Sequence, residues 1–307
     1  MKWIACIVFL FALNAGIAQR ISHADMATLK TKEDSLRSPS FKLIQGINAS
    51  DRLQADSVFT KILVRALKIN NSFYYPFDSL ITISTLYPTD STFRIFTWQM
   101  IINDNVIRQH GAIQMKTTDG SLKLFPLIDK SDITENMADT IGSNFGWMGA
   151  LYYNIITTSF NGNFYYTLLG FDENNIRSNK KVIEVLHFEN DKPVFGGHYF
   201  SFPPKHPYSN DISRYIYEFK KESGPRLTYD NQLQMIVMEH LVSESNEPNK
   251  LWTLVGDGDY EGFKWVGGKW VYNSKIFNEV TPEGQAPIPN MILDEKGKVI
   301  DSNLKKN

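Results

Sequence analysis

The stretch TFRIFTWQMII, residues 92–102, decides the fold class, because most of its residues are β-branched or aromatic and therefore favour extended strands. Comparable runs follow along the chain, among them ALYYNIITTSF at 150–160, NFYYTLLGF at 163–171 and KVIEVLHF at 181–188. Runs of this length and composition, bounded by turn residues, are typical of β-strands. The chain from about residue 78 onward is therefore predicted to be mostly β-sheet.

Turn-forming residues separate these runs and indicate how the strands pair. The candidates are Asn103-Asp104-Asn105, Asp119-Gly120, Asn161-Gly162, the DENN of 172–175, and Ser223-Gly224. Asn-Gly and Asp-Gly readily adopt the positive φ angles of two-residue hairpin turns. Neighbouring strands are thus expected to pair antiparallel as a meander, and no motif recurs at the fixed period of a propeller or solenoid.

Helical periodicity is confined to the N-terminal part of the chain. In SVFTKILVRALKI, residues 57–69, apolar residues recur at helical spacing, and Ser50 and Asp51 precede the run as candidate N-caps. The apolar positions are Val58, Ile62, Leu63 and Leu67. The pattern predicts a helix over 51–69 and a weaker helix over 22–37, both packed against the sheet.

The expected fold class is therefore α+β: mainly an antiparallel β meander, closed as a sandwich or an irregular barrel, with a short helical N-terminal segment. The expected divisions are a signal peptide at 1–18, the helical segment at 19–70, the antiparallel β domain at 71–278 and a Pro-containing polar tail at 279–307.

The first residues, MKWIACIVFLFALNAGIA, predict export. Lys2 precedes an apolar run from Trp3 to Leu13, and the small residues Gly16 and Ala18 indicate cleavage after Ala18. This run is too short to cross a bilayer, and no later stretch approaches the roughly 18 apolar residues that a span requires. The protein is therefore expected to be secreted, into the periplasm or out of the cell, as a soluble protein with no transmembrane segment in the mature chain.

Cysteine content and charge exclude several classes of protein. Cys6 is the only cysteine and lies within the predicted signal peptide, so no disulfide, cysteine nucleophile or Cys-ligated metal is expected in the mature chain. The formal net charge is −1, and no block of basic residues stands out. This balance argues against a nucleic-acid partner and against an anionic membrane surface.

The stretch GDGDYEGFKW, residues 256–265, is the nearest approach to a ligand-binding motif. Asp257, Asp259 and Glu261 alternate like the first ligands of a calcium loop, but the closing position of such a loop would be Gly268. Two readings remain open. The acids form a turn before a core hairpin, or they form a non-helical calcium site, since three close carboxylates repel one another unless a cation or solvent screens them. No cofactor is expected, with calcium as the exception if the second reading holds.

The residues that follow predict a hairpin around Gly267-Gly268. A two-residue turn at this point pairs Trp265 with Trp270. It also pairs Phe263 with Tyr272, so all four rings lie on one face, and such a face favours burial. Trp265, Trp270 and Tyr272 are nevertheless the candidates for a ligand-binding surface.

Common catalytic motifs are absent from the sequence. No window matches the G-x-S-x-G of α/β-hydrolases, the H-E-x-x-H of zinc peptidases or a Gly-rich phosphate loop. His187 and Glu189 share one face of a predicted strand, and His198 and His206 follow. An imidazole–carboxylate metal site is therefore one alternative to a hydrogen-bonded core histidine at position 187.

Glutamates on aromatic-rich strands keep a glycosidase among the candidate functions, since such enzymes use two carboxylates. The candidate acids are Glu184, Glu218 and Glu239. Aromatic residues of the same strands could form a carbohydrate-binding platform or pack in a core. They are Tyr152, Tyr153, Tyr165, Tyr166, Tyr215, Tyr217, Trp265 and Trp270.

Five stretches carry a resemblance to a known group of proteins. They are KLFPLIDKSD (123–132), WMGALYYNII (147–156), YYTLLGFDENN (165–175), KVIEVLHF (181–188) and GDGDYEGFKWVGGKWVY (256–272). Together they resemble uncharacterised exported proteins of the Bacteroidetes, over roughly residues 80–278. The resemblance implies export and a shared fold, and it assigns no activity and no functional residues.

The sequence favours an exported protein that binds or scaffolds an envelope or extracellular protein or glycan without catalysis, because catalytic motifs are absent while aromatic residues and hairpin loops are abundant. Two alternatives remain. One is a glycan or cell-wall hydrolase that uses two carboxylates. The other is a structural module stabilised by calcium at Asp257, Asp259 and Glu261.

Overall fold

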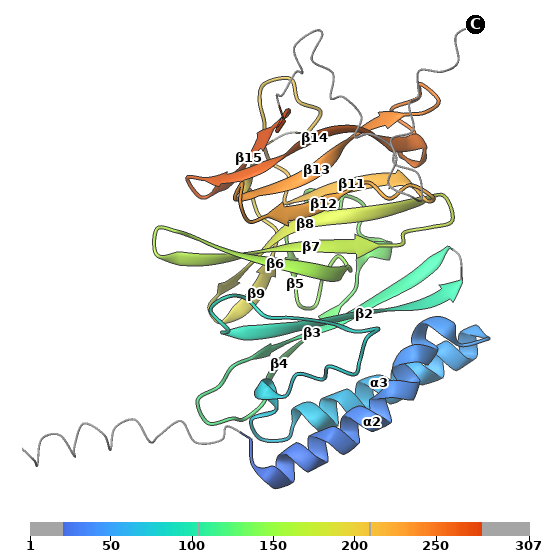
Figure 1. Ribbon diagram of the computed structural model, residues 1–307, viewed down its shortest axis with the longest axis vertical. Helices are drawn as coiled ribbons and strands as arrows, with labels where there is room; N and C mark the ends of the chain where they lie inside the picture. Colours follow the sequence, from blue (N-terminus) through green and yellow to red (C-terminus); the bar gives the residue numbers. More distant parts are fainter. Residues whose placement is uncertain (1–20, 104, 209, 278–307) are drawn as a thin grey trace, which may run out of the picture.

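The computed structural model describes residues 21–103, 105–208 and 210–277, and these form four stacked layers (Figure 1). Two helices form the first layer, and three sheets follow broadly in chain order. The fold is thus α+β with mainly antiparallel strands, as predicted. The predicted signal peptide and polar tail lie outside the described residues. None of the described helices combines the length and the apolar character that crossing a membrane requires.

The first helix, α2 (His23–Gln45), is longer than its sequence pattern predicts. Ser22 is its N-cap, and the Ser22 hydroxyl accepts a hydrogen bond from the Asp25 N–H at 3.0 Å. The helix continues through Pro39, although proline removes one backbone hydrogen bond. Leu43, beyond this proline, is fully buried, so packing against the rest of the protein extends the helix past its predicted end.

The second helix, α3 (Ala49–Leu67), begins two residues before its predicted start. Its N-cap is Asn48, whereas Ser50 and Asp51 were expected to fill this role. Asp51 acts from within the first turn, where its carboxylate accepts a hydrogen bond from the Asn48 N–H at 3.3 Å. The apolar face is also rotated, because Val58 is 39% exposed while Phe59 is fully buried.

Three sheets contain the strands of the described chain. The first sheet has the order β1-β2-β3-β4, with β1 (Ser84–Leu86), β2 (Phe93–Asn103), β3 (Val106–Met115) and β4 (Lys123–Ile128). The central sheet has the order β5-β9-β8-β7-β6, with β11 also paired to β8; its strands are β5 (Gly142–Ser143), β6 (Leu151–Phe160), β7 (Asn163–Asp172), β8 (Ser178–Glu189), β9 (Lys192–Phe195) and β11 (Arg214–Lys220). The third sheet has the order β10-β15-β14-β13-β12, with β10 (Phe200–Ser201), β12 (Leu227–Asp230), β13 (Met235–Ser243), β14 (Leu254–Val266) and β15 (Lys269–Asn273). The β10–β15 pair is parallel, and the other described pairs are antiparallel.

Strands that are buried on both faces hold the layers together. Along β2, Phe96 and Trp98 face the helices, while Phe93 and Ile95 face the central sheet. Because side chains alternate between the faces of a strand, one strand contributes to two separate cores. The stretch at 92–102 that indicates β structure in the sequence is therefore the strand that packs against the helices on one face and against the central sheet on the other.

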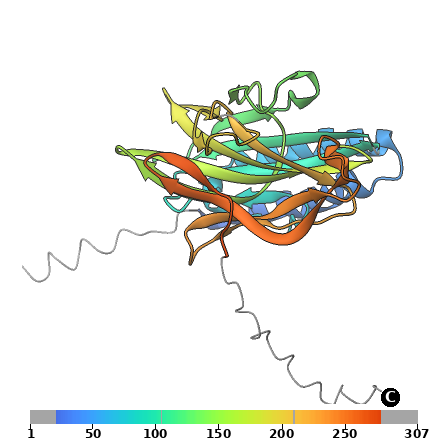
Figure 2. The same cartoon turned by 90° about the horizontal axis from the view of Figure 1, so that it is seen from above.

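The central sheet repeats this arrangement one layer further along. Leu168 packs toward the first sheet, whereas its neighbour Leu169 packs toward the third. On β8, Leu186 packs toward the first sheet and Val185 packs toward the third. Strands of successive sheets run in broadly similar directions (Figure 2), which is how twisted sheets pack when aligned face to face.

The predicted turns are confirmed at some positions and wrong at others. Asn161-Gly162 forms a two-residue hairpin turn, with φ angles of 50° and 79°, between Phe160 and Asn163. Asp119-Gly120 lies within a longer connection, since the β3–β4 pairing ends at Met115 and Lys123. Ser223-Gly224 joins strands of different sheets, so it forms no hairpin. Local sequence therefore indicates where the chain turns but not which strands the turn joins.

A buried ion pair joins the neighbouring strands β8 and β11 of the central sheet. Arg214 is fully buried, and its Nε donates to Glu184 Oε2 at 3.0 Å, while its guanidinium also donates to the Thr140 carbonyl at 2.7 Å. The Tyr152 hydroxyl donates to the other Glu184 oxygen and accepts from Trp147 Nε1 at 2.7 Å. Each charged group thus has several partners, which a buried pair requires to offset the loss of hydration.

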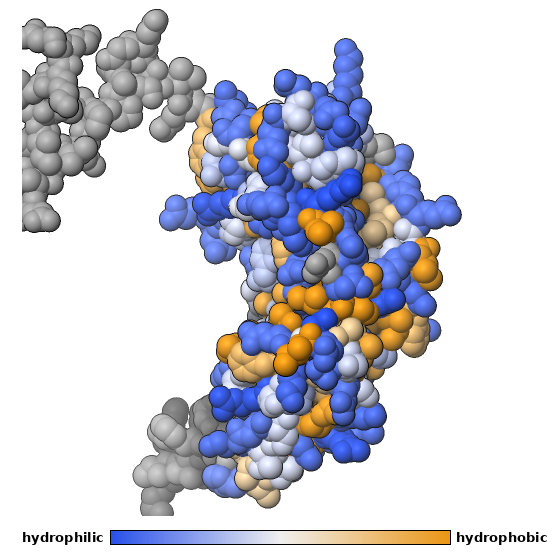
Figure 3. Space-filling model, turned by 90° about the vertical axis from the view of Figure 1, so that its right-hand side faces the viewer, coloured by the Kyte–Doolittle hydropathy of each residue, from blue (hydrophilic) through white to orange (hydrophobic). Residues whose placement is uncertain are grey.

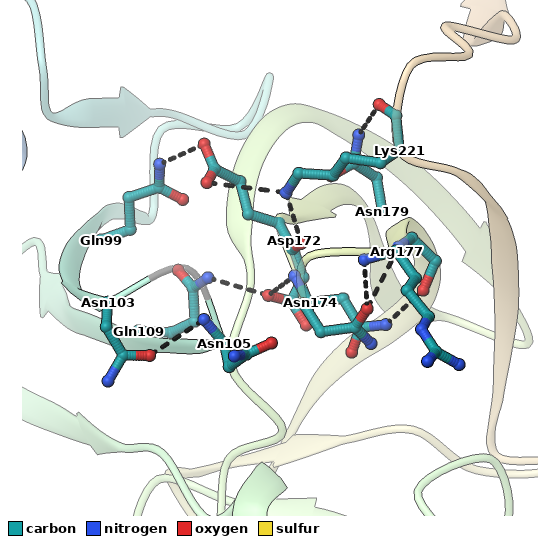
Figure 4. A network of polar contacts seen from close by, with 12 residues as sticks. Gln99, Asn103, Asn105, Gln109, Asp172, Asn174, Arg177, Asn179 and Lys221 are labelled. Carbon is teal, nitrogen blue, oxygen red and sulfur yellow. Dashed lines mark hydrogen bonds and ion pairs between the residues drawn. The ribbon is translucent and has the colours of Figure 1, made fainter. Parts of the chain in front are cut away.

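A second polar network joins the end of the first sheet to the β7–β8 connection (Figure 4). Gln99 Nε2 donates to Glu173 Oε1, and Gln109 Nε2 donates to Asp172 Oδ1, each at 3.3 Å. Lys221 donates to the Glu173 carbonyl at 2.9 Å. Burial raises the pKa of Asp172, which is in keeping with its position inside the interface.

Apolar side chains are unevenly distributed over the surface. On the side of the molecule shown in Figure 3, they gather near the middle of the stack, among hydrophilic side chains that cover most of the rest. Exposed apolar residues of the described chain include Ile176 in the β7–β8 connection, which is 58% exposed.

Glu184→Ala is expected to lower the free energy of unfolding by about 3–5 kcal/mol, because Arg214 would remain buried without its counter-charge. Glu189→Ala is the matched control on the same strand. The Glu189 side chain is 65% exposed, and losing its ion pair with His187 should change stability by less than about 1 kcal/mol. Urea denaturation followed by circular dichroism measures both, and equal losses would contradict a structural role for the buried pair.

Candidate functional site

The predicted hairpin is confirmed in its register. Gly267 and Gly268 have φ angles of 59° and 81°, and β14 pairs with β15 so that Trp265 lies opposite Trp270. Trp270 is fully buried, and its Nε1 donates to Thr167 Oγ1 at 2.8 Å. Trp265 is partly exposed and packs edge-on against Trp270, with ring centroids 5.4 Å apart. The two tryptophans pack the third sheet against the central sheet. Because Trp270 is fully buried, a ligand cannot reach it.

Tyr272 is the candidate aromatic residue that lies at a cleft. Its ring is 4.5 Å from the His206 ring between centroids, and its hydroxyl donates to Glu261 Oε2 at 2.5 Å. Phe263, opposite Tyr272 in the register, is fully buried beneath it. Tyr272 therefore has one edge in the core and the other on the surface.

The acidic stretch lies inside β14, where the sequence reading places a turn. The β13–β14 register shifts between Glu239, opposite Tyr260, and Leu241, opposite Gly256, so Asp257 and Asp259 lie in an irregular bulge around Gly258, whose φ is 90°. Glu261 stays in register, opposite Met238. Extra residues on one strand bend it and redirect its side chains. The bulge therefore positions Asp257 and Asp259.

The acids make contacts in two separate places. Asp257 Oδ2 is 2.8 Å from His240 Nδ1, Asp257 Oδ1 accepts the Asp259 N–H at 3.0 Å, and Glu261 accepts from Tyr272. Among residues 21–103, 105–208 and 210–277, no three His, Asp or Glu side chains are grouped so that they could hold a metal ion. The calcium site at Asp257, Asp259 and Glu261 stays a prediction for which these contacts give no support.

A cleft of about 710 Å³ opens between β11 and the third sheet, beside Tyr272. We call it the Tyr272 cleft, and its lining residues are His206, Pro207, Tyr208, Tyr215, Ile216, Tyr217, Glu218, His240, Leu241, Pro248, Asn249, Leu251, Leu254, Glu261 and Tyr272. Several predicted candidates thus come together in one concave site, namely His206, Tyr215, Tyr217, Glu218, Glu261 and Tyr272. Trp265 and Trp270 lie outside its lining.

Tyrosines dominate the walls of the Tyr272 cleft. Tyr215 and Tyr217, two residues apart on β11, are 6% and 3% exposed. Tyr208 is partly exposed, and its ring centroid is 4.9 Å from that of Tyr215. Burial raises the pKa of Tyr215 well above its ordinary value, and nearby Tyr208 and Glu261 add to the increase. The tyrosine hydroxyls therefore stay protonated at neutral pH. Those of Tyr208 and Tyr272 donate to the Ile216 carbonyl and to Glu261, and each can still accept a hydrogen bond.

Two carboxyl groups near the cleft differ in their acidity. Glu261 is 7% exposed, and its burial raises its pKa even though the Tyr272 hydroxyl and His240 oppose the change. Burial also acts to raise the pKa of Asp257, but hydrogen bonds from His240 and from the Asp259 N–H outweigh it and lower that pKa. Opposite shifts in neighbouring acids are a feature of sites that use one as an acid.

The other predicted acids each bind partners outside the group formed by His240, Asp257 and Glu261. Glu184 pairs with Arg214, and Glu218 accepts from Ser178 Oγ at 2.5 Å. The Glu239 carboxylate accepts the Arg226 N–H at 3.2 Å and covers Gly256, where an added Cβ would lie 2.2 Å from it. Of these three glutamates only Glu218 lines the Tyr272 cleft, so no two of them form a pair there.

His187 belongs to a different part of the surface. Its Nε2 is 2.9 Å from Glu189 Oε1, and its ring packs against Tyr165 and Tyr199. His206 lies in the Tyr272 cleft, so His187 and His206 do not meet in one metal site. The hydrogen-bonded histidine expected from the sequence fits this arrangement.

Sequence reasoning missed His240 and Tyr208. Tyr215 and Tyr217 were among the predicted aromatic residues, and their alternation in RYIYEFKK was the available signal. His240 carried no local signal, because its partner Asp257 lies on the next strand across the bulge. The pairing of strands, which is a tertiary feature, creates this contact.

No protein-family model, curated protein or solved structure matches the chain.

Glu261→Gln is expected to change the pH dependence of stability. Because burial raises the pKa of Glu261, the folded state binds a proton more tightly than the unfolded state, so the contribution of Glu261 is largest at low pH and is lost as pH rises through the raised pKa. The melting temperature of the variant should therefore rise relative to that of the parent as pH increases above about 4.3, the ordinary pKa of glutamate. A difference that is constant with pH would contradict this prediction.

Proposed function

We propose that the protein is an exported binding protein that holds a carbohydrate in the Tyr272 cleft. The observation that carries the proposal is the tyrosine-rich wall formed by Tyr208, Tyr215 and Tyr272 around a concave site. Sugar rings have apolar C–H faces and hydroxyl edges. Tyrosine matches both, because its ring offers an apolar face and its hydroxyl offers a hydrogen bond.

The size and polarity of the cleft support a small oligosaccharide. Its volume, about 710 Å³, lies within the range of about 300–1,000 Å³ that is usual for ligand sites. His240 and Glu261 add a few polar groups to aromatic walls, and this combination fixes the orientation of a ligand. The ring of His206, beside Tyr272, extends the stacking surface toward the rim.

The predicted export and a resemblance support the proposal. Export is inferred from the sequence of residues 1–18, and the stretches between 123 and 272 resemble uncharacterised exported proteins of the Bacteroidetes. A glycan of the envelope or of the surroundings is the ligand that suits such a location. The formal net charge of −1 favours a neutral ligand of this kind over a nucleic acid.

Tyr272→Ala and His206→Ala are each expected to weaken glycan binding about tenfold, which corresponds to about 1.4 kcal/mol. The full chain is tested against purified peptidoglycan, arabinoxylan, pectin and β-mannan, first by thermal melting and then by titration calorimetry. A ligand at about 100 times its dissociation constant adds roughly 2.7 kcal/mol of stability, so melting detects it.

Phe145→Ala is the control for this experiment, because Phe145 is 69% exposed and lies outside the cleft lining. It should leave binding unchanged. Melting of each free variant checks that the fold is intact. Binding that Tyr272→Ala and His206→Ala leave unaltered would remove the cleft from the proposal, and no binding to any of the four polymers would overturn it.

A further inference from the structure

Two ionisable pairs face the Tyr272 cleft from neighbouring strands. Glu261 of β14 lies opposite Met238 of β13, and His240 is two residues beyond Met238, so His240 and Glu261 share one face as diagonal neighbours. Both line the cleft. Asp257 holds His240, and Tyr272 holds Glu261, so each group has a partner that orients it.

The contact with Asp257 determines what His240 can do. His240 Nδ1 is 2.8 Å from Asp257 Oδ2, and a carboxylate at this distance favours the tautomer with the proton on Nδ1. Nε2 then carries the lone pair. The His240 side chain is 45% exposed, so water can reach it. A histidine oriented by a carboxylate in this way is equipped to remove a proton from water.

Glu261 is suited to donate a proton, whereas His240 is suited to accept one. It is 7% exposed in the cleft wall, and Tyr272 occupies Oε2, which leaves Oε1 as the oxygen that can carry a proton toward a ligand. Burial raises its pKa, so the protonated form persists to higher pH than in an ordinary glutamate. A carboxyl whose protonated form is favoured by burial and an imidazole oriented by a carboxylate thus lie on one wall of the cleft.

We propose that the cleft hydrolyses the glycan that it binds, with Glu261 as general acid and His240 as general base. This inference rests on the proposed function. His240 Nε2 removes a proton from a water molecule as the water oxygen bonds to the anomeric carbon. The glycosidic C–O bond breaks, and the departing oxygen takes the proton of Glu261. The imidazolium then loses its proton to solvent and the carboxylate regains one, so one water is consumed and both groups are restored.

Asp257 is a positioning residue in this scheme, because it acts through His240. Asp259, two residues along the same bulge, makes no contact with His240 or Glu261 among the described interactions, and its backbone N–H donates to Asp257. The pair Asp257 and Asp259 therefore offers a matched comparison within one acidic stretch.

The test measures binding and cleavage separately on the full chain. Each polymer that shifts the melting temperature, among peptidoglycan, arabinoxylan, pectin and β-mannan, is incubated with the protein, and new reducing ends are counted. The parent is expected to release them. Glu261→Gln and His240→Asn should each lower the rate at least about 100-fold, the usual contribution of a general acid or base, while affinity changes less than about threefold.

Asp257→Asn should lower kcat with KM unchanged, because the substrate contacts remain and only the orientation of His240 is lost. Asp259→Asn should leave kcat and KM at the parent values. A kcat in Asp257→Asn equal to that of Asp259→Asn would refute the positioning role.

The outcomes separate the two proposals. A polymer that binds the parent without release of reducing ends overturns hydrolysis and leaves the binding function standing. Release that survives in both Glu261→Gln and His240→Asn overturns the assigned roles. If none of the polymers binds, the proposed function fails, and the inference fails with it.

Discussion

The structure depends on strands that are apolar on both faces. β2 and β8 cannot lie on a surface, because each would expose one row of large side chains to water, and burying such side chains is the main favourable contribution to folding. The helices cover the outer face of the first sheet, and the third sheet covers the central one. The stack ends there because β14 has exposed residues such as Lys264 and Val266 on its outer face.

Two fully buried arginines show how polar groups are accommodated in this stack. Arg214 pairs with Glu184, whereas Arg94 donates to the carbonyls of Ser72 and Tyr75 at 2.8 Å and 2.6 Å and has its guanidinium 4.6 Å from the Phe96 ring centroid. Burial lowers the pKa of Arg94, but an arginine keeps its charge at neutral pH. Both side chains hold connecting segments against the sheets, so they determine where those segments run.

The Tyr272 cleft lies at the margin of the core between the central and third sheets. Tyr215, Tyr217 and Phe263 belong to that core, and the same tyrosines form part of the cleft wall. The site is therefore built on rigid strands, which keeps its polar groups in place before a ligand arrives. The same construction explains why the pKa of Glu261 is raised, since this side chain is buried beside the core.

The sequence by itself determined the class of the fold and some local details. Strand composition predicted the β layers, the Gly267-Gly268 signal predicted a hairpin with the observed register, and helical spacing predicted both helices. These features depend on neighbours within a few residues. The tertiary structure alone decided that Asp257 meets His240 and that Glu261 faces the tyrosines of β11. It also decided that Asp257 and Asp259 lie in a strand bulge. These contacts depend on which strands pair and which sheets stack, and that choice follows from burying all the apolar faces at once, which no short stretch of sequence encodes.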